Sequence, residues 1–302
     1  MWCNTDDGIV SNNSFGVLQN ENVSGRGHFD LSGYEIINVL IQREREVSWG
    51  KNIQTILKDA RYAFGSHVGG RRSRGRGGRA ERAEGFSNPF LLNGPKGFAE
   101  FNPLPENDGI FVRLDLPDVP EECVRVCISG SKKAVIVYGE APKVHAHDSS
   151  SRKYLTIIET VCTCCDFSSF TYQMSDGVLR LLLSKTSTDP SSCIPVLAFC
   201  YGEGLSGDNT DDHGKVYESK QLENGSLYVR LDMPGVPKDN FAVTVANGIV
   251  KVTGQAPSVS HDSAGRFYSG DVAMLSAPVN IPSRRIKTIA KNGVIRLLIP
   301  PL

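Results

Sequence analysis

The sequence carries no net charge, because 33 Lys and Arg residues balance 33 Asp and Glu residues. A balanced total gives no overall attraction to nucleic acid or to an anionic membrane, so any such preference has to be local. No stretch approaches the roughly 20 apolar residues that a membrane-spanning helix needs. The first residues, MWCNTDDGIV, lack the basic segment and apolar run of a secretory signal. We therefore expect a soluble protein of the nucleus or cytoplasm whose 8 cysteines are reduced thiols.

Motifs of nucleotide-driven or metal-dependent catalysis are also lacking. The chain has no GxxxxGK[ST], no GxGxxG after a strand and no HExxH. His147-Asp148-Ser149 recurs as His261-Asp262-Ser263, but three consecutive loop residues generally do not align as a catalytic triad. We interpret both triplets as hydrogen-bonded loop caps, with a phosphorylation site as the alternative. We expect no catalytic residue, and the protein is not expected to be an enzyme.

A cysteine cluster at Cys162, Cys164 and Cys165 is the nearest approach to a metal site. Zinc sites usually pair such ligands with a second pair at a defined distance, and none follows here. His145 and His147 could complete a site, but small apolar packing is the favoured interpretation for the cysteines. We therefore expect neither a metal nor another cofactor.

What the sequence does contain is an internal repeat, in which residues 109–183 and 225–299 share five landmarks in the same order. Landmarks that keep their order over this length predict a tandem duplication. They are VRLDLPDVP and VRLDMPGVP, two alternating apolar segments at 124–128 and 241–245, AVIVYGEAP and IVKVTGQAP, HDSSSRKY and HDSAGRFY, and DGVLRLLL and NGVIRLLI.

Each copy shows the pattern of a β protein. Apolar residues alternate with others in IFVRLD (110–115) and LYVRLD (227–232), which places one apolar face of a strand against a core. Asn247-Gly248 lies between two such runs and predicts a hairpin turn, since both central residues of a type I′ turn need positive φ. Asp176-Gly177 and Asn292-Gly293 indicate further turns. The prediction is a mainly β protein with two tandem immunoglobulin-like β-sandwiches of about 80–100 residues each.

These landmarks resemble the α-crystallin domain of small heat-shock proteins. The resemblance is carried by the turns at 115–119 and 232–236, by the strand-ending glycines Gly139 and Gly254, and by the closing run at 290–295. A doubled domain behind a long N-terminal region resembles the plant α-crystallin-domain proteins of the 57 kDa heat-shock-like type. That resemblance implies a chaperone or stress-response role. Some such relatives are implicated as nuclear partners of methyl-DNA-binding proteins in active DNA demethylation.

Two features depart from the family pattern. The stretches YLTIIETVCTCCDF and YSGDVAMLSAPVNIP lack the arginine that the family usually carries in an F-x-R-x-F-x-L-P strand. The loops before them, at 142–154 and 257–268, are short where plant relatives place the strand exchanged between dimer partners. The usual dimer and large multimer are therefore in doubt, and the two copies could pair with each other inside one chain.

The predicted organisation has four parts: an N-terminal region (1–105), a first domain (106–185), a linker (186–219) and a second domain (220–302). The N-terminal region shows no β pattern, and its apolar spacing predicts short amphipathic helices at 33–47 and 51–64. These helices could bind partners or dock on a sandwich. Residues 69–85 are rich in Gly and Arg, and we expect disorder there. Weak phosphate contacts or a solvated linker are the two interpretations of the arginines, which are Arg71, Arg72, Arg74, Arg76, Arg79 and Arg82.

The linker contains an apolar island at Ile194-Pro195-Val196. The island lies about ten residues beyond Leu183, where small heat-shock proteins carry an I-x-[IV] tail motif. Two β-branched side chains separated by one residue point the same way in an extended chain, so they can fill neighbouring pockets while the backbone adds to a sheet edge. We expect these three residues to bind a partner edge, with generic packing on the nearest domain as the alternative.

Two functions remain after these exclusions, and both make other proteins the partners. The first is a scaffold or co-chaperone that uses sheet edges and grooves to hold defined partners, in a complex that could regulate chromatin. The alternative is an ATP-independent holdase that binds unfolded clients. The missing assembly features favour the scaffold. We expect no membrane binding, and nucleic acid to be bound only weakly or indirectly.

Overall fold

The computed structural model describes residues 88–104, 109–160, 164–187, 195–202, 216–275 and 282–301, with only the backbone described at 187 and 195–202. All of them belong to one compact unit, Gly77–Leu302. The expected helices at 33–47 and 51–64 and the Gly/Arg-rich segment, with Arg71, Arg72, Arg74, Arg76 and Arg79, lie outside the described residues. None of the helices in the described part of the chain is long and apolar enough to cross a bilayer.

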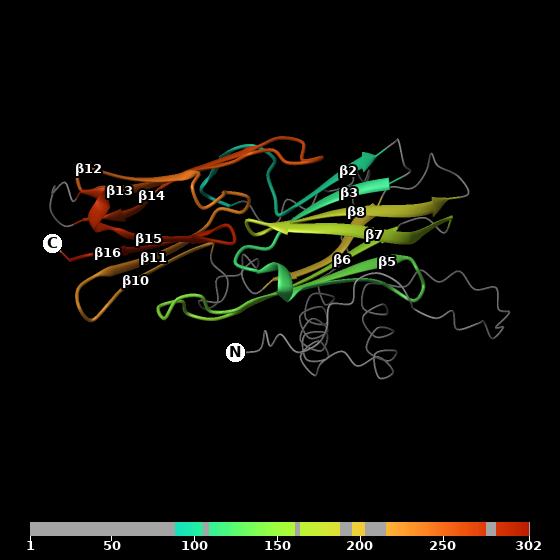
Figure 1. Cartoon of the computed structure of the whole chain (residues 1–302), viewed down its shortest axis with the longest axis horizontal. Helices are drawn as coiled ribbons and strands as arrows, with labels where there is room; N and C mark the ends of the chain where they lie inside the picture. Colours follow the sequence, from blue (N-terminus) through green and yellow to red (C-terminus); the bar gives the residue numbers. More distant parts are fainter. Residues whose placement is uncertain are drawn as a thin grey trace, which may run out of the picture. The chain divides into compact units, whose positions relative to one another are not determined.

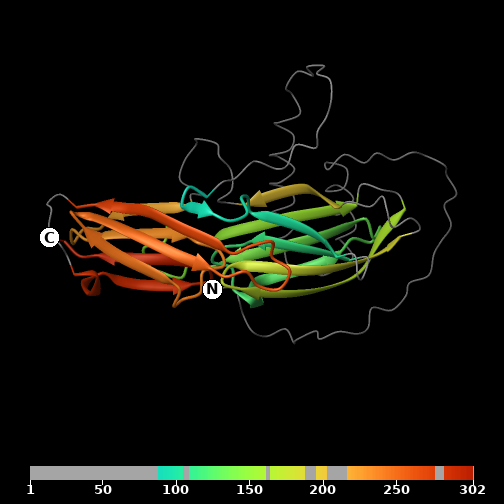
Figure 2. The same ribbon diagram turned by 90° about the horizontal axis from the view of Figure 1, so that it is seen from above.

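The described chain is mainly β, as the alternating pattern predicted, and its strands form four antiparallel four-stranded sheets. Two sheets belong to the first copy of the repeat and two are built largely from the second (Figures 1 and 2). Two short 3-10 helices, Glu121–Cys123 and Ser283–Arg285, come before β4 and β15.

The first copy encloses one apolar core between its two sheets. Ile110, Val112 and Leu114 alternate into this core from one sheet, and Val135 and Val137 enter it from the other. The first sheet has the order β2 (Ala99–Leu104), β3 (Gly109–Asp115), β8 (Val178–Ser187) and β7 (Cys165–Ser175). The second has the order β4 (Val124–Ile128), β5 (Ala134–Ala141), β6 (Arg152–Thr160) and β9 (Pro195–Gly202).

The second copy repeats this arrangement, with Val229, Leu231, Val250 and Val252 in its core. One sheet has the order β10 (Tyr217–Gln221), β11 (Leu227–Asp232), β16 (Val294–Ile299) and β15 (Lys287–Lys291). The other has the order β1 (Leu91–Asn93), β14 (Arg266–Met274), β13 (Ile249–Ala256) and β12 (Phe241–Ala246). Two pairs of sheets, each around its own core, are compatible with the expected tandem sandwiches.

The predicted turns have the backbone that their residues favour. Asn247 and Gly248 have φ values of 52° and 79°, Asp176 and Gly177 have 48° and 70°, and Asn292 and Gly293 have 48° and 66°. Positive φ at both central residues is what a type I′ turn requires, and Asx-Gly pairs supply it at little cost.

Some strands lie outside the two predicted domains. Strands β1 and β2 lie inside residues 1–105, where no β pattern was expected, and β9 lies inside the predicted linker 186–219. β1 precedes the first copy in sequence, yet it pairs with β14 of the second copy. All three are short or outermost strands, and Pro103 and Pro195 interrupt their pattern, so period-two alternation is weak there.

The cysteines also differ from expectation at two positions. Cys123 and Cys165 are disulfide-bonded, so the prediction of reduced thiols throughout is wrong at these positions. Cys165 is fully buried.

Candidate functional site

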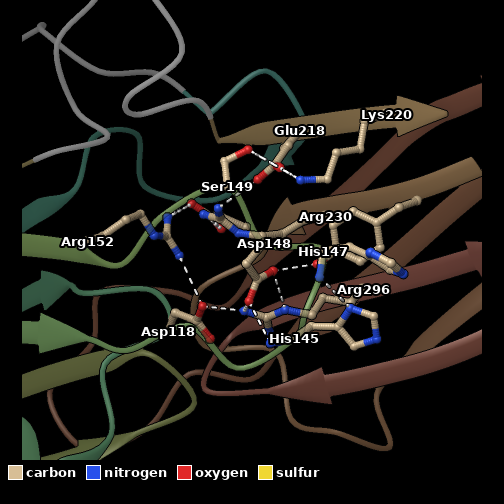
Figure 3. A network of polar contacts seen from close by, with 12 residues as sticks. Asp118, His145, His147, Asp148, Ser149, Arg152, Glu218, Lys220, Arg230 and Arg296 are labelled. Carbon is tan, nitrogen blue, oxygen red and sulfur yellow. Dashed lines mark hydrogen bonds and ion pairs between the residues drawn. The ribbon is translucent and has the colours of Figure 1, made fainter. Parts of the chain in front are cut away.

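The repeated polar landmarks meet where the two copies contact each other. We call residues 142–151, between β5 and β6, the first loop, and residues 257–265, between β13 and β14, the second loop. Asp148 of the first loop pairs with Arg296 of β16, with 3.0 Å between Oδ1 and Nε. Asp262 of the second loop pairs with Arg180 of β8, with 2.7 Å between Oδ2 and Nη2. Equivalent residues of the two copies thus make equivalent contacts in opposite directions, and Figure 3 shows the one made by Asp148.

A second pair of arginines strengthens this exchange. Arg152, at the start of β6, contacts Asp232 of the second copy at 2.6 Å between Nη1 and Oδ2. Its equivalent Arg266, at the start of β14, pairs with Asp115 of the first copy. All four side chains are buried. Each copy therefore supplies one aspartate-bearing strand end and one arginine to the other.

Serine and glutamate side chains hold the tips of both loops. The Ser149 hydroxyl donates to Glu218 Oε1 of β10 at 2.6 Å. The Ser263 backbone N–H donates to Glu100 Oε1 of β2 at 2.6 Å, and its hydroxyl donates to the same oxygen. The loop caps predicted for the His-Asp-Ser triplets are confirmed, because Asp148 accepts the His145 N–H at 2.8 Å and Asp262 accepts the Val259 N–H at 3.1 Å. The same aspartates also join the copies.

The proline turns and the closing hairpins make the backbone part of the contact. Asp118 donates its N–H to Asn292 O at 2.9 Å, and Gly235 donates its N–H to Asp176 O at 2.7 Å. Tyr154 supports the first turn from within its own copy by donating to Pro117 O at 3.0 Å. The contact between the copies therefore combines backbone hydrogen bonds with buried ion pairs.

Asp148 is the most heavily hydrogen-bonded carboxylate of the site. Burial alone would raise its pKa, but hydrogen bonds from Arg296, Tyr228 and the His145 backbone hold the pKa well below its ordinary value of 3.8. Burial and the neighbouring Asp148 carboxylate raise the pKa of Tyr228. Asp148 is therefore ionised at neutral pH while the Tyr228 phenol keeps its proton and donates it to Asp148 Oδ1.

One position breaks the symmetry of the two turns. Asp118 has a φ of 73° and its carboxylate pairs with Arg296, whereas Gly235 occupies the equivalent position with a φ of 88°. A Cβ atom on Gly235 would lie 3.1 Å from Ala256 Cβ and 3.2 Å from Arg113 Nη2, so a larger residue has little room there. Burial raises the pKa of Asp118 above its ordinary value of 3.8, although Arg296 and Arg152 oppose this.

The structure places the predicted partner-binding motif only in part. Ile194 lies outside the described residues. Pro195 and Val196 begin β9 and pair with Thr160 and Glu159 at the edge of β6. The partner-binding role of this motif stays a prediction, as do the phosphate contacts of the Gly/Arg-rich segment.

The arginines and aspartates of the site were quoted among the repeat landmarks, but their role was missed. Arg180 and Arg296 stand between core residues of β8 and β16, and Arg113 and Arg230 hold matching positions in β3 and β11. A charged residue repeated at the same place in two otherwise apolar strands is a signal that could have identified an interface. Within the described residues, no group of three or more His, Cys, Asp and Glu side chains could hold a metal ion.

Comparison with known proteins defines the class. The sequence profile of the family described as predicted plant small heat shock protein matches residues 79–302, and the chain belongs to this family. The repeated α-crystallin-like landmarks lie within the matched residues. The resemblance inferred from the repeat is therefore confirmed.

Individual relatives are consistent with this membership. The chain is 34% identical, over 283 residues, to a protein of Arabidopsis thaliana named as a 57 kDa heat shock protein, covering 61% of this chain and 53% of that protein. It is 33% identical over 82 residues to a chloroplastic small heat shock protein of Solanum lycopersicum, covering 26% of this chain and 35% of that one. The chain thus spans about half of the first relative and about a third of the second.

Among solved structures, the CS-b5R domains of human Ncb5or in the NAD+ form match at 11% identity and a TM-score of 0.25. The match covers 68% of this chain and 61% of that one, and it carries no argument here.

Proposed function

We propose that this protein is a non-enzymatic, protein-binding scaffold or co-chaperone in which the two copies serve as each other's dimer partner. The observation that carries the proposal is the reciprocal pairing of Asp148 with Arg296 and of Asp262 with Arg180. In a two-fold dimer, equivalent residues exchange the same contacts in both directions, and here both partners belong to one chain. The chain then needs no second subunit to satisfy these charges.

A chain that needs no second subunit has few binding sites per particle, and this favours defined partners over many unfolded clients. The outer faces of the β2-β3-β8-β7 and β10-β11-β16-β15 sheets carry Arg180 and Arg296, which the opposite loop occupies. The outermost strands β7 and β15 carry the exposed apolar side chains Tyr172 and Ile289. Edges of this kind can take an extended segment of a partner by adding it as a strand. Family resemblance supports placing such a complex in the nucleus, with chromatin regulation as its role.

The second candidate is an ATP-independent holdase, which membership in a small heat shock protein family favours. Generic holdases act through multivalent oligomers, so the two candidates differ in mass and in stoichiometry. Both bind proteins and neither requires a cofactor.

Light scattering on the purified full chain, followed by a client-aggregation assay, separates the two candidates. The scaffold predicts a monomer that fails to suppress aggregation of a heat-denatured client at low molar ratio. A matched variant, Arg180→Met with Arg296→Met, should be less stable than the wild type, because it leaves carboxylates of both loops without these partners. A wild-type protein that forms large polydisperse oligomers and suppresses aggregation would overturn the scaffold and establish the holdase.

A further inference from the structure

The two loops differ in their aromatic contacts, although they are built alike. In the first loop His145 stacks on Tyr228 of β11, with ring centroids 5.2 Å apart and planes 8° apart. His147 lies 5.0 Å from His145 and 5.6 Å from Tyr228. The second loop has Val259 at the position of His145, and its His261 packs 5.5 Å from Phe111, the equivalent of Tyr228. A histidine pair on a tyrosine therefore exists on only one side of the contact.

The hydrogen bonds around His145 favour a neutral ring. The backbone N–H of His147 donates to His145 Nδ1 at 3.3 Å, so this nitrogen is an acceptor. The adjacent Asp148 carboxylate already receives five hydrogen bonds. Its donors are the backbone N–H groups of Val144 and His145, the Tyr228 hydroxyl, and Nε and Nη2 of Arg296. A second proton on His145 would put a donor on Nδ1 and break the hydrogen bond from the His147 N–H, and this opposes the attraction of the ring to the Asp148 charge.

The charges that face His145 come from every element around it. His147 and Asp148 lie on its own loop, Tyr228 and Arg230 on β11, and Arg296 on β16. Glu218 and Lys220 lie on β10, Asp118 follows β3, and Arg152 starts β6 (Figure 3). The acids here are engaged by Arg296, Arg152, Arg230 and Lys220, and Lys220 Nζ lies 5.7 Å above the Tyr228 ring. Burial first, and then His147, lower the pKa of His145 below its ordinary value of 6.5.

We propose that His145 is a pH-sensitive latch that holds the first loop on the second copy when neutral and loosens it when protonated. Acid should loosen the loop because the pKa of His145 is lower in the folded state than in the unfolded state. The stabilisation is complete above the unfolded value of 6.5 and is lost as pH falls through the lower folded value. The second loop has no histidine at position 259, so its contact with the first copy should not change with pH in this way. Acidification therefore weakens one side of the contact between the copies, where the first loop covers the β10 and β11 surface.

Amide hydrogen exchange on the full chain at pH 7.5 and 5.5, corrected for the intrinsic rate, tests the latch. Protection of the Val144, His145 and Asp148 amides should fall, by at most about tenfold, because pH 5.5 lies one unit below the unfolded pKa of 6.5. The second-loop amides of Val259 and Asp262 should keep theirs. His145→Val copies the residue that the second loop already tolerates, so it should fold and should show no such fall. His261→Gln is the matched control and should behave as the wild type.

A parallel titration of the histidine ring resonances makes the result decisive. His145 should titrate below 6.5, and its resonance is assigned by its loss in His145→Val. An equal loss of protection in wild type and His145→Val would overturn the latch, as would a wild type without any loss. A His145 pKa at or above 6.5 would do the same. His145→Gln repeats the test if the valine variant does not fold.

Discussion

Arginines at the centre of apolar strands are the residues that set this protein's architecture. Arg113, Arg180, Arg230 and Arg296 are between 1% and 6% exposed, and each is within reach of a carboxylate. Burying a charge is costly unless it is paired, so ion pairs of this kind add less to stability than to the choice of partner. An apolar strand face could pair with many surfaces, whereas a buried arginine accepts only one that brings an aspartate.

Asp148 and Asp118 both pair with Arg296, so replacing each in turn measures how much a buried ion pair adds to stability. Asp148→Asn should lower the free energy of unfolding by about 3 kcal/mol at pH 7, because it removes a charge that Arg296 and Tyr228 stabilise. Asp118→Asn should change it by less than about 1 kcal/mol, because burial already disfavours the ionised form of Asp118 and raises its pKa. Urea unfolding of both variants and the wild type checks the contrast.

The pH dependence separates the two carboxylates further. The contribution of Asp148 is complete above its unfolded pKa of 3.8 and is lost as pH falls through its lower folded value. The difference in free energy of unfolding between the wild type and Asp148→Asn should therefore narrow below about pH 4. The pKa of Asp118 is higher in the folded state than in the unfolded state. The difference in free energy of unfolding between the wild type and Asp118→Asn should therefore not narrow below about pH 4. Equal losses in the two variants at pH 7 would contradict this account.

Residue patterns predicted which side chains form the core but not which charges meet. Val112 and Leu114 were assigned to the core because alternation is a local property of the strand. The contact of Arg296 with Asp118 joins residues 178 positions apart, so no local pattern contains it. The duplicated His-Asp-Ser triplets were correctly interpreted as caps, since a cap bonds residues three or four positions away.

Closing hairpins at the element scale do more than reverse the chain. A Cβ atom on Gly177 would lie 2.3 Å from Asn292 O, and one on Gly293 would lie 2.3 Å from Asp176 O. The two Asx-Gly turns therefore pack backbone against backbone across the copies. Only glycine allows both the positive φ and the close approach.

Gly177→Ala and Gly293→Ala should each destabilise the protein more than an alanine in an ordinary hairpin. Gly248→Ala, in the β12–β13 turn, has a similar φ of 79° and should cost about 1 kcal/mol from backbone strain. The two interface variants should lose a further 1–3 kcal/mol because the new methyl group forces the copies apart. Chemical denaturation of the three variants measures the difference. Equal losses in all three would show that the hairpins do not carry the contact.

Three strands at outer positions of the sheets, β1, β2 and β9, were not predicted from the sequence. β1 has three residues, and β2 and β9 contain prolines. Such strands are held by pairing with a neighbour more than by their own alternation. The central strands β3, β5, β11 and β13 were anticipated, because both copies repeat the same apolar period there.

At the scale of the whole molecule, the exchange of loops makes each copy depend on the other. Asp148 and Asp262 point in opposite directions across the contact, so separating the copies would strip both Arg296 and Arg180 of these partners. Copies coupled in this way should unfold together. In calorimetry the wild type should therefore show one transition over the described unit, with equal calorimetric and van't Hoff enthalpies.

The double variant Asp148→Asn with Asp262→Asn should divide that transition in two. Each copy retains its own apolar core, so it can stay folded after the contact weakens. A matched control removes the half-exposed pair Lys133–Asp166, which joins atoms 2.8 Å apart within the first copy. Lys133→Ala with Asp166→Ala should keep a single transition, because both residues lie within one copy and pairs this open to solvent contribute little. If the aspartate variant also melts in one step, the copies are coupled by something other than these charges.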